Sequence, residues 1–176
     1  MKIFFTGDHH FNHKNVIKYC ERPFESIEIM DAELIKRWNE KVSPNDVVYH
    51  LGDFCLNSLK LTRKYFSQLN GDIHILDNFW HHDKMWIADI KKNNEIISTK
   101  SGIVSLISPI FIIKTEGKIL ILSHYPQEEW DRKHYGAIHF HGHSHGNSRK
   151  MENRFDIGVD CWNFYPVALK EILGEK

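Results

Sequence analysis

Cysteine is scarce in this chain, and its spacing offers no framework for disulfides. The 176 residues include three cysteines, Cys20, Cys55 and Cys161, which lie far apart and form no C-x-x-C pair. An odd number of widely spaced cysteines is typical of reduced, mostly buried thiols in a reducing compartment. We therefore expect three free thiols.

Long hydrophobic runs are absent as well. A helix that crosses a bilayer needs about 20 consecutive apolar residues, and no stretch of this sequence provides them. Near the start of the chain, Asp8 interrupts the apolar residues before a signal-type stretch could finish. These absences predict a cytoplasmic protein with no membrane partner.

The chain has no excess of charge of either sign. Lysine and arginine together number 23, as do aspartate and glutamate, so the formal net charge is +0. Tight, sequence-independent binding to nucleic acid depends on many contacts between basic side chains and phosphates, which this balance disfavours. Nucleic acid is therefore expected only as a substrate. No pattern in the sequence indicates an oligomeric state.

Histidine, by contrast, is plentiful, and it gathers with carboxylates in short segments. The chain has 13 histidines. Asp8-His9-His10 lies near the start, Gly52-Asp53 follows, and histidines alternate with other residues within 140–146. Imidazole and carboxylate groups at such spacings suit a divalent transition metal, and the carboxylates between the histidines favour two ions over one.

The first half of the sequence alternates strands with helices. Residues 2–6, 47–51 and 72–76 are predicted to be buried strands, and residues 26–42 and 56–69 have helical spacing. This order is typical of a parallel sheet with crossover helices, in which ligands bind beyond the carboxyl ends of the strands. The polar residues that follow the three strands are Asp8 and His10, then Asp53, then Asp77 and Asn78.

The second half is richer in strands. No repeat, low-complexity tract or linker separates it from the first, so residues 1–176 are predicted to form one domain with a hydrophobic core. The predicted fold is mixed α/β, with two mixed sheets packed together and flanked by helices in four layers, α/β/β/α. Extended segments are expected at 95–98, 103–107, 111–115, 118–122, 138–141 and 155–159, with a hairpin turn at Glu116-Gly117 and a closing helix at 166–173.

Local spacing predicts which side chains reach a common ion. Side chains two apart in extended backbone point the same way, so Asp8 and His10 are expected to face one metal. His143 and His145 repeat this spacing, flanked by glycines at 142 and 146 that allow tight turns. Further donors are Asp53, an anion able to bridge two cations, Asn78, which offers an amide oxygen, and His124, which ends another apolar strand.

The order of these pieces resembles that of a known family. Read along the chain, Asp8-x-His10, Gly52-Asp53, Asn78, His124 and Gly142-His143-x-His145 are similar to the motifs of the calcineurin-like metallophosphoesterases. The likeness is greatest to small, single-domain members from bacteria and phages, which residues 8–15 and 158–162 also resemble, and it extends over residues 5–166. The resemblance implies the four-layer fold and a metal-dependent phosphohydrolase that cleaves a small phosphomonoester or phosphodiester.

The resemblance also implies a role for each donor. Two divalent transition metal ions, manganese first and iron, zinc or nickel as alternatives, would share Asp53 and a hydroxide that attacks phosphorus in line. The metals would neutralise charge on the phosphoryl oxygens during this attack. The first ion would bind Asp8, His10, Asp53 and His145, and the second Asp53, Asn78, His124 and His143.

One segment departs from the family pattern, which is Gly-Asn-His followed by Asp or Glu. Here residues 77–83 read Asp-Asn-Phe-Trp-His-His-Asp. Asn78 is aligned with the ligand asparagine because it ends a strand, and His82-Asp83 with the His-Asp pair, in which the carboxylate raises the pKa of the acid. Two alternatives stay open: His81 as metal ligand in place of Asn78, and His81 as general acid in place of His82. The catalytic residues would be Asp53 and one of these two histidines.

Nearby polar residues are candidates for contacts with substrate. His13 and Asn15 are two of them, and Arg22 is a third because its guanidinium suits a phosphate, although an exposed loop and a surface turn also account for these residues. His9 should point away from its neighbour His10 and pack behind it. Two alternative functions remain: a non-catalytic metal-binding scaffold of the same fold, and a nuclease that acts on nucleic-acid ends.

Overall fold

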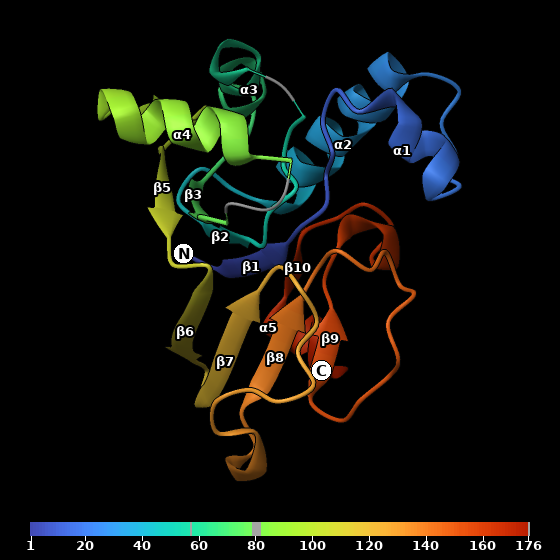
Figure 1. Ribbon diagram of the computed structural model, residues 1–176, viewed down its shortest axis with the longest axis vertical. Coiled ribbons are helices and arrows are strands. Elements are labelled where there is room, and N and C mark those ends of the chain that lie inside the picture. Colours follow the sequence, from blue (N-terminus) through green and yellow to red (C-terminus); the bar gives the residue numbers. More distant parts are fainter. Residues whose placement is uncertain (57, 79–81, 176) are drawn as a thin grey trace.

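Two β-sheets pack against each other in the computed structural model, which describes residues 1–56, 58–78 and 82–175 (Figure 1). The larger sheet has the strand order β10-β1-β2-β3-β5-β4 and the smaller one β6-β7-β8-β9. Apolar side chains from both sheets, among them Leu51 and Leu122, form one buried cluster between them. Within it the rings of Phe5 and Phe140 meet edge to face, with centroids 5.0 Å apart.

The larger sheet brings the first polar loops to one edge. Its first three strands run parallel, with Ile3 beside Val47 and Val47 beside Asp72, so their carboxyl ends lie together. This confirms the parallel arrangement predicted from the alternation of strands and helices. The parallel strands are β1 (Ile3–Thr6), β2 (Val47–His50), β3 (Asp72–Leu76) and β5 (Ile103–Ile107), and β4 (Ile97–Ser98) and β10 (Val167–Ala168) pair antiparallel at the edges.

Helices cover the other face of the larger sheet (Figure 1). In the longest, Met30, Leu34 and Trp38 form the predicted apolar stripe and are fully buried. The Ser26 hydroxyl caps this helix by accepting a hydrogen bond from the Ile29 N–H at 3.3 Å. The helices are α1 (Lys14–Tyr19), α2 (Ile27–Lys41), α3 (Leu59–Phe66) and α4 (Lys84–Asn93), of which the sequence pattern predicted α2 and α3.

The smaller sheet combines an antiparallel hairpin with parallel strands. Glu116 and Gly117 form its turn with φ of +47° and +74°, as a type I′ turn requires, which confirms the predicted hairpin. The outer face is covered by residues 124–137, where Trp130 packs on Ile121 and its indole N–H donates to the Ala137 carbonyl at 2.9 Å. The strands are β6 (Ile110–Thr115), β7 (Lys118–Ser123), β8 (Ile138–His141) and β9 (Arg154–Asp156), and the short 3-10 helix η1 (Lys133–Tyr135) lies in the covering segment.

Both sheets are mixed and flanked by helices, which confirms the predicted layered α/β fold. Two boundaries differ from prediction near the end of the chain. The strand expected at 155–159 ends at Asp156, and the 3-10 helix η2 (Val159–Cys161) follows. The closing helix α5 (Leu169–Leu173) begins later than 166, because Val167 and Ala168 pair with the open edge of β1. Among the described residues, no helix has both the length and the apolar character needed to span a membrane.

Candidate metal centre

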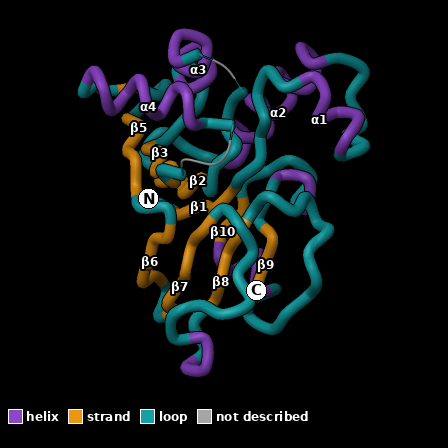
Figure 2. The backbone as a smooth tube through the Cα atoms, in the orientation of Figure 1, coloured by secondary structure: helices purple, strands orange, loops and turns teal. Residues whose placement is uncertain are grey.

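Loops from both sheets are joined by backbone hydrogen bonds on the loop-rich side of the molecule (Figure 2). The Asp8 N–H donates to the Gly52 carbonyl at 3.0 Å, which links the loops after β1 and β2. In the smaller sheet, the Gly142 N–H donates to the His124 carbonyl at 3.0 Å and links the loops after β7 and β8. Residues far apart in the sequence therefore meet at fixed positions.

The backbone at the expected metal ligands is unusual. A left-handed φ costs an L-residue roughly 1–2 kcal/mol, and such residues cluster at functional sites when the surroundings hold them. The expectation that Asp8 and His10 lie in extended backbone is therefore wrong, and both side chains are aimed by left-handed turns instead. The values of φ are +57° at Asp8, +54° at His10, +53° at Asp53, +65° at His143 and +46° at His145.

The Asp8 carboxylate packs against two glycines, whose lack of side chains leaves space for it. This carboxylate is fully buried, and Oδ2 accepts a hydrogen bond from the His143 N–H at 2.8 Å. A Cβ atom at Gly142 would lie 2.6 Å from this oxygen, and one at Gly158 would lie closer still. Gly142 was expected to permit a tight turn, but its φ is not left-handed. Its lack of a side chain instead makes room for the Asp8 carboxylate.

Asp53 lies between two groups of donor atoms. Its Oδ2 is 3.4 Å from Nε2 of His10 and 3.6 Å from Nε2 of His124. The donor atoms of Asp8, His10 and Asp53 lie within 4.8 Å of one another, and so do those of Asp53, His124 and His143. One carboxylate is thus common to two clusters, each of which could hold a metal ion.

Hydrogen bonds at Nδ1 fix the orientation of three imidazole rings. Nδ1 of His124 lies 3.0 Å from the Leu51 carbonyl, and Nδ1 of His145 lies 2.6 Å from Oδ2 of Asp160. Nδ1 of His10 lies 3.4 Å from Nδ1 of His13. A ring that carries its proton on Nδ1 keeps its lone pair on Nε2, the arrangement usual for a histidine that binds a metal.

The buried donors fit a cation. Burial raises the pKa of Asp8 well above its ordinary value and lowers the pKa of His10 well below its own, so both groups are driven toward their neutral forms. Asp8 Oδ1 and His10 Nε2 are buried and have no hydrogen-bond partner among the described residues. Leaving such atoms without a partner is costly, and a divalent cation would satisfy both while accepting a carboxylate and a neutral imidazole.

Arg22 is buried behind the loop that carries Asp8 and His10, which corrects its expected role in binding substrate. Its side chain is fully buried, and Nε and Nη2 donate to the two carboxylate oxygens of Asp160 at 2.7 and 2.8 Å. Nη2 also donates to the Asp8 carbonyl at 2.6 Å and Nη1 to the His9 carbonyl at 2.9 Å. Nη1 further contacts Sδ of Met30 at 3.5 Å. The five N–H groups of the guanidinium are thereby occupied, and none is left for a phosphate.

Asp160 connects Arg22 to His145, and sequence reasoning assigned it no role. Burial alone would lower the pKa of His145, but hydrogen bonds with Asp160 and Cys20 and the nearby Asp8 carboxylate raise it to about 10. The ring therefore holds a proton that a metal ion would displace. The clue in the sequence was residues 158–162, which resemble the small members of the family but gave no partner for the carboxylate.

His9 turns away from the centre and links two of its loops. Its Nδ1 lies 2.9 Å from Nε2 of His50, and the Gly52 N–H donates to Nδ1 of His50 at 3.1 Å. The His9 ring is fully buried and meets the Trp38 ring edge to face, with centroids 5.3 Å apart. This packing agrees with the orientation expected for a residue next to His10.

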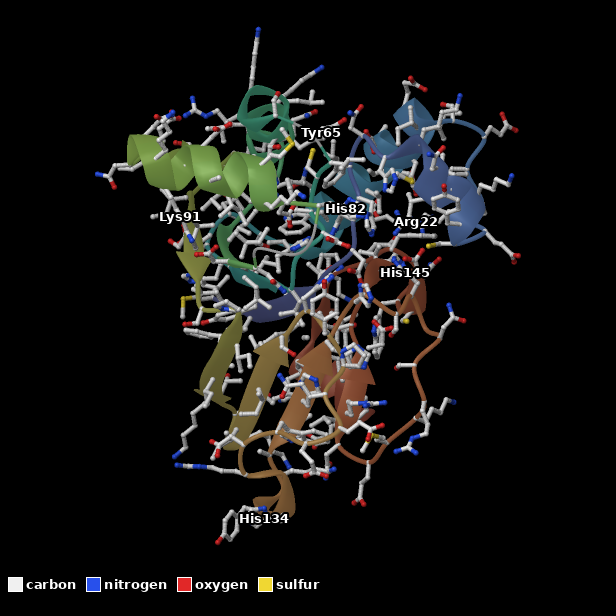
Figure 3. All side chains as sticks on the ribbon, in the orientation of Figure 1. Arg22, Tyr65, His82, Lys91, His134 and His145 are labelled. Carbon is white, nitrogen blue, oxygen red and sulfur yellow. The ribbon has the colours of Figure 1, made fainter. Side chains whose placement is uncertain are left out.

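His82 lies at the centre (Figure 3). The next residue, Asp83, has a different role. The His82 N–H donates to Oδ1 of Asp53 at 3.0 Å, and its ring lies 5.0 Å from the rings of both His10 and His13. The Asp83 carboxylate accepts hydrogen bonds at 3.0 Å from the N–H groups of residues 54 and 55, and one at 2.9 Å from the Trp86 indole. Asp83 thereby holds the loop that follows Asp53.

The remaining predicted residues lie at different distances from the centre. Asn78 is buried and follows the end of β3 at Leu76, and its role as a metal ligand stays a prediction. His81 lies outside the described residues. Two cavities open onto the centre, and His13 lines one of them. Asn15 is exposed on α1 and is not among the residues that line either cavity.

Comparison with known proteins places the chain in a family. No family model matches it. The uncharacterized protein MJ1445 of Methanocaldococcus jannaschii is 32% identical over 181 residues, which cover 98% of this chain and 89% of the relative. The chain therefore belongs to the family of this archaeal protein. The gene 66 protein of Mycobacterium phage L5 is 25% identical over 197 residues, covering 90% of this chain and 86% of the phage protein.

One solved structure shares the fold, and a second matches more weakly. The crystal structure of AQ665, a protein of unknown function from Aquifex aeolicus, matches with a TM-score of 0.70 at 21% identity and covers 98% of this chain and 97% of that one. A structure described as a novel archaeal phosphodiesterase matches with a TM-score of 0.48 at 18% identity, over 90% of this chain and 82% of that one. A likeness at that level does not extend to activity.

Proposed function

We propose that the chain is a metal-dependent phosphohydrolase of the calcineurin-like metallophosphoesterase type. The observation that carries this proposal is the position of Asp53, whose Oδ2 lies within 3.6 Å of imidazole nitrogens from two separate donor groups. A carboxylate shared in this way suits two cations held close together. The order of the motifs along the sequence supports the same conclusion.

The donors divide into two proposed metal positions. The mixed nitrogen and oxygen ligands favour manganese, iron, zinc or nickel over calcium, and manganese is proposed first. Two cations so held supply Lewis acidity and lower the pKa of water, so that a nucleophile is present at neutral pH. Asp8, His10, Asp53 and His145 are proposed for the first position, and Asp53, Asn78, His124 and His143 for the second.

The protein's own groups orient the phosphoester and move a proton. His82 is proposed as the general acid that protonates the leaving oxygen, because its backbone N–H donates to Asp53 and so fixes its position, and its ring lies beside those of His10 and His13. His13, on the cavity wall, is proposed to donate a hydrogen bond to a phosphoryl oxygen. Arg22 takes no part in binding and instead fixes the loop that carries Asp8 and His10.

Activity with a defined set of substrates tests the proposal. Purified protein supplied with Mn²⁺ should hydrolyse an aryl phosphate or a bis-aryl phosphate, and Asp53→Asn should abolish hydrolysis because the shared carboxylate is lost. Asp89→Asn, which changes an exposed carboxylate on α4, is the matched control and should keep full activity. Hydrolysis that survives in Asp53→Asn would exclude this mechanism.

The same experiment separates the scaffold alternative. A non-catalytic scaffold would bind two metal ions per chain without hydrolysing any phosphoester offered with Mn²⁺, Fe²⁺, Zn²⁺ or Ni²⁺. Metal content measured by mass spectrometry therefore accompanies the activity assay. Loss of metal in Asp53→Asn but not in Asp89→Asn would place the ions at the proposed centre.

A further inference from the structure

The candidate centre lies where two cavities meet. One has a volume of about 360 Å³ and the other about 500 Å³, and both are lined by Asp53, His82 and His143. The smaller cavity is completed by Leu56, Lys84, Met85, His124 and Tyr125, and the larger extends past Val16, Tyr19 and Asn147. A ligand at Asp53 therefore has room on two sides.

This arrangement distinguishes between classes of phosphoester. A monoester carries one organic group on phosphorus, whereas a diester carries two. In-line displacement places the leaving oxygen opposite the attacking one, so the leaving and retained groups of a diester extend in different directions. Small-molecule sites typically occupy about 300–1,000 Å³. Each cavity alone reaches that range, and two cavities therefore suit a phosphorus atom with a substituent on either side.

Charge at the cavity walls agrees with a diester. A diester phosphate carries one negative charge, whereas a monoester carries close to two at neutral pH. Among the described residues that line the two cavities, Lys84 is the one lysine or arginine, because the Arg22 guanidinium is buried behind the loops. Polyphosphates and dianionic monoesters are usually bound by several guanidinium or ammonium groups. The walls therefore match the lower charge.

Each cavity has a tyrosine on its wall. Tyr125 is 38% exposed, and its ring lies edge-on to the rings of His143 and His124 with centroids 4.5 and 4.8 Å away, so it stands next to the second donor group. Tyr19 is 71% exposed and lines the other cavity. Stacking of a nucleobase on an aromatic side chain is worth about 1–3 kcal/mol per base. One such platform in each cavity suits a base on each side of the phosphate.

We propose that the substrate is an internucleotide phosphodiester bound with one nucleoside in each cavity. This inference rests on the proposed phosphohydrolase function and specifies its substrate. A dinucleotide and the end of a longer single strand offer the same chemistry at this site.

Substrate preference tests the inference. Protein with Mn²⁺ is supplied with a linear dinucleotide, a single-stranded oligonucleotide and a 5′-mononucleotide. A bis-aryl phosphate and the aryl phosphate with the same aryl group serve as the simple diester and monoester. The dinucleotide should be cleaved with a kcat/KM at least about tenfold above that for release of phosphate from the mononucleotide, a factor equal to about 1.4 kcal/mol. Equal rates per end on the oligonucleotide would point to strands as the source, and slower cleavage would point to dinucleotides.

Variants of the two platforms provide the second test. Tyr19→Leu and Tyr125→Leu should each lower kcat/KM for the dinucleotide about tenfold. Each substitution should have a smaller effect on a dimethyl diester, or on a methyl aryl diester whose methyl group lies in the cavity of the substituted tyrosine. Tyr135→Leu, at an 81% exposed tyrosine in η1 outside both cavities, should leave it unchanged. Tyrosine variants that cleave the dinucleotide as well as the parent protein does would overturn the inference.

The outcomes separate the inference from the function on which it rests. Faster hydrolysis of monoesters than of diesters would keep the phosphohydrolase and reject the internucleotide substrate. If neither monoesters nor diesters are hydrolysed, the phosphohydrolase function is rejected. Binding of the dinucleotide then tests whether the cavities are nucleoside sites. Dinucleotide binding to the Mn²⁺-loaded protein, measured by calorimetric titration, should be weaker in both Tyr19→Leu and Tyr125→Leu if the cavities are nucleoside sites, and an unchanged affinity in both variants would reject them.

Discussion

The two donor groups that share Asp53 are supported in different ways. On one side His145 is backed by the Asp160 carboxylate, which Arg22 holds with two hydrogen bonds from 138 residues away. On the other side His124 is backed by the Leu51 backbone carbonyl, and His143 is exposed and lines both cavities. The first group is braced by charged side chains, and the second is left open to ligands.

This difference bears on how the two proposed positions hold metal. A carboxylate behind a metal-binding imidazole raises its basicity, and loss of such a partner typically costs 10–100-fold in metal affinity. We therefore expect two unequal steps in a titration with Mn²⁺, the tighter one at the braced side. The open side would be the one at which substrate and metal bind together.

Breaking the brace should have the largest effect. Asp160→Ala leaves the buried Arg22 guanidinium without its partner, which typically costs about 3–5 kcal/mol of unfolding free energy. Urea unfolding should detect this loss, and calorimetric titration with Mn²⁺ should lose its tighter step. A urea midpoint equal to that of the parent, together with two intact binding steps, would show that the Arg22–Asp160 pair contributes neither to stability nor to metal affinity.

A double substitution separates stability from metal binding. Arg22→Met with Asp160→Leu removes both charges and fills the space with apolar atoms, which is often neutral or stabilising. The unfolding free energy should recover part of the loss, because the Asp8 and His9 carbonyls still lack the donors that Arg22 supplied. The tighter Mn²⁺ step should stay absent because His145 still lacks its carboxylate partner.

A methyl group beside Asp8 should have the next largest effect. Gly142→Ala would place Cβ 2.6 Å from the Asp8 carboxylate, and overpacking of this kind costs typically about 1–3 kcal/mol. Thermal unfolding should show the loss, with weaker binding of Mn²⁺ at the braced side. Gly7→Ala is the matched control, because its nearest neighbour would be Cβ of Leu51 at an ordinary 3.5 Å. Equal melting temperatures for the two variants would contradict the close packing of Gly142 against the Asp8 carboxylate.

A pH-dependent contribution from Asp31 should be the smallest of the three. Burial raises the pKa of Asp31 from 3.8 to about 6, and its carboxylate accepts hydrogen bonds from the Asn12 N–H at 3.2 Å and the Tyr65 hydroxyl at 2.6 Å. Since the folded protein binds this proton more tightly than the unfolded chain, stability falls as the pH rises between these two values and stays lower above them.

Asp31→Asn removes this ionisation and keeps an oxygen that can accept either hydrogen bond. Above pH 7 the variant should be more stable than the parent by on the order of 1 kcal/mol, after allowance for screening by solvent, and the difference should shrink toward pH 4. Urea unfolding at several pH values measures it. Asp131→Asn changes an exposed carboxylate, and its unfolding free energy should differ from that of the parent by the same amount at every pH.

Much of the fold follows from local sequence patterns. The strands at 72–76, 103–107 and 138–141 have the predicted boundaries because short apolar runs there end in turn residues or polar residues. The helix α4 lies outside the predicted elements, although Trp86, Ile87 and Ile90 form its buried face at helical spacing.

The candidate site was predicted less completely, for reasons of geometry. Arg22 precedes a proline and has the local pattern of a surface turn, and its burial is decided by Asp160, a distant residue that no spacing rule connects to it. The left-handed backbone at Asp8 and His10 is also invisible locally, because neither is a glycine. Motif order identified which residues gather, whereas long-range hydrogen bonds determine how they are held.

The paired rings of His9 and His50 have one more consequence. With the Gly52 N–H donating to one ring and that ring donating to the next, the direction of every proton in the series is set, and burial keeps the pKa of His9 down to about 3. His9 therefore stays uncharged near neutral pH. These contacts fix the spacing between the loops after β1 and β2 without any metal ion, so a proposed exchange of one cation for another would require no rearrangement of the two loops.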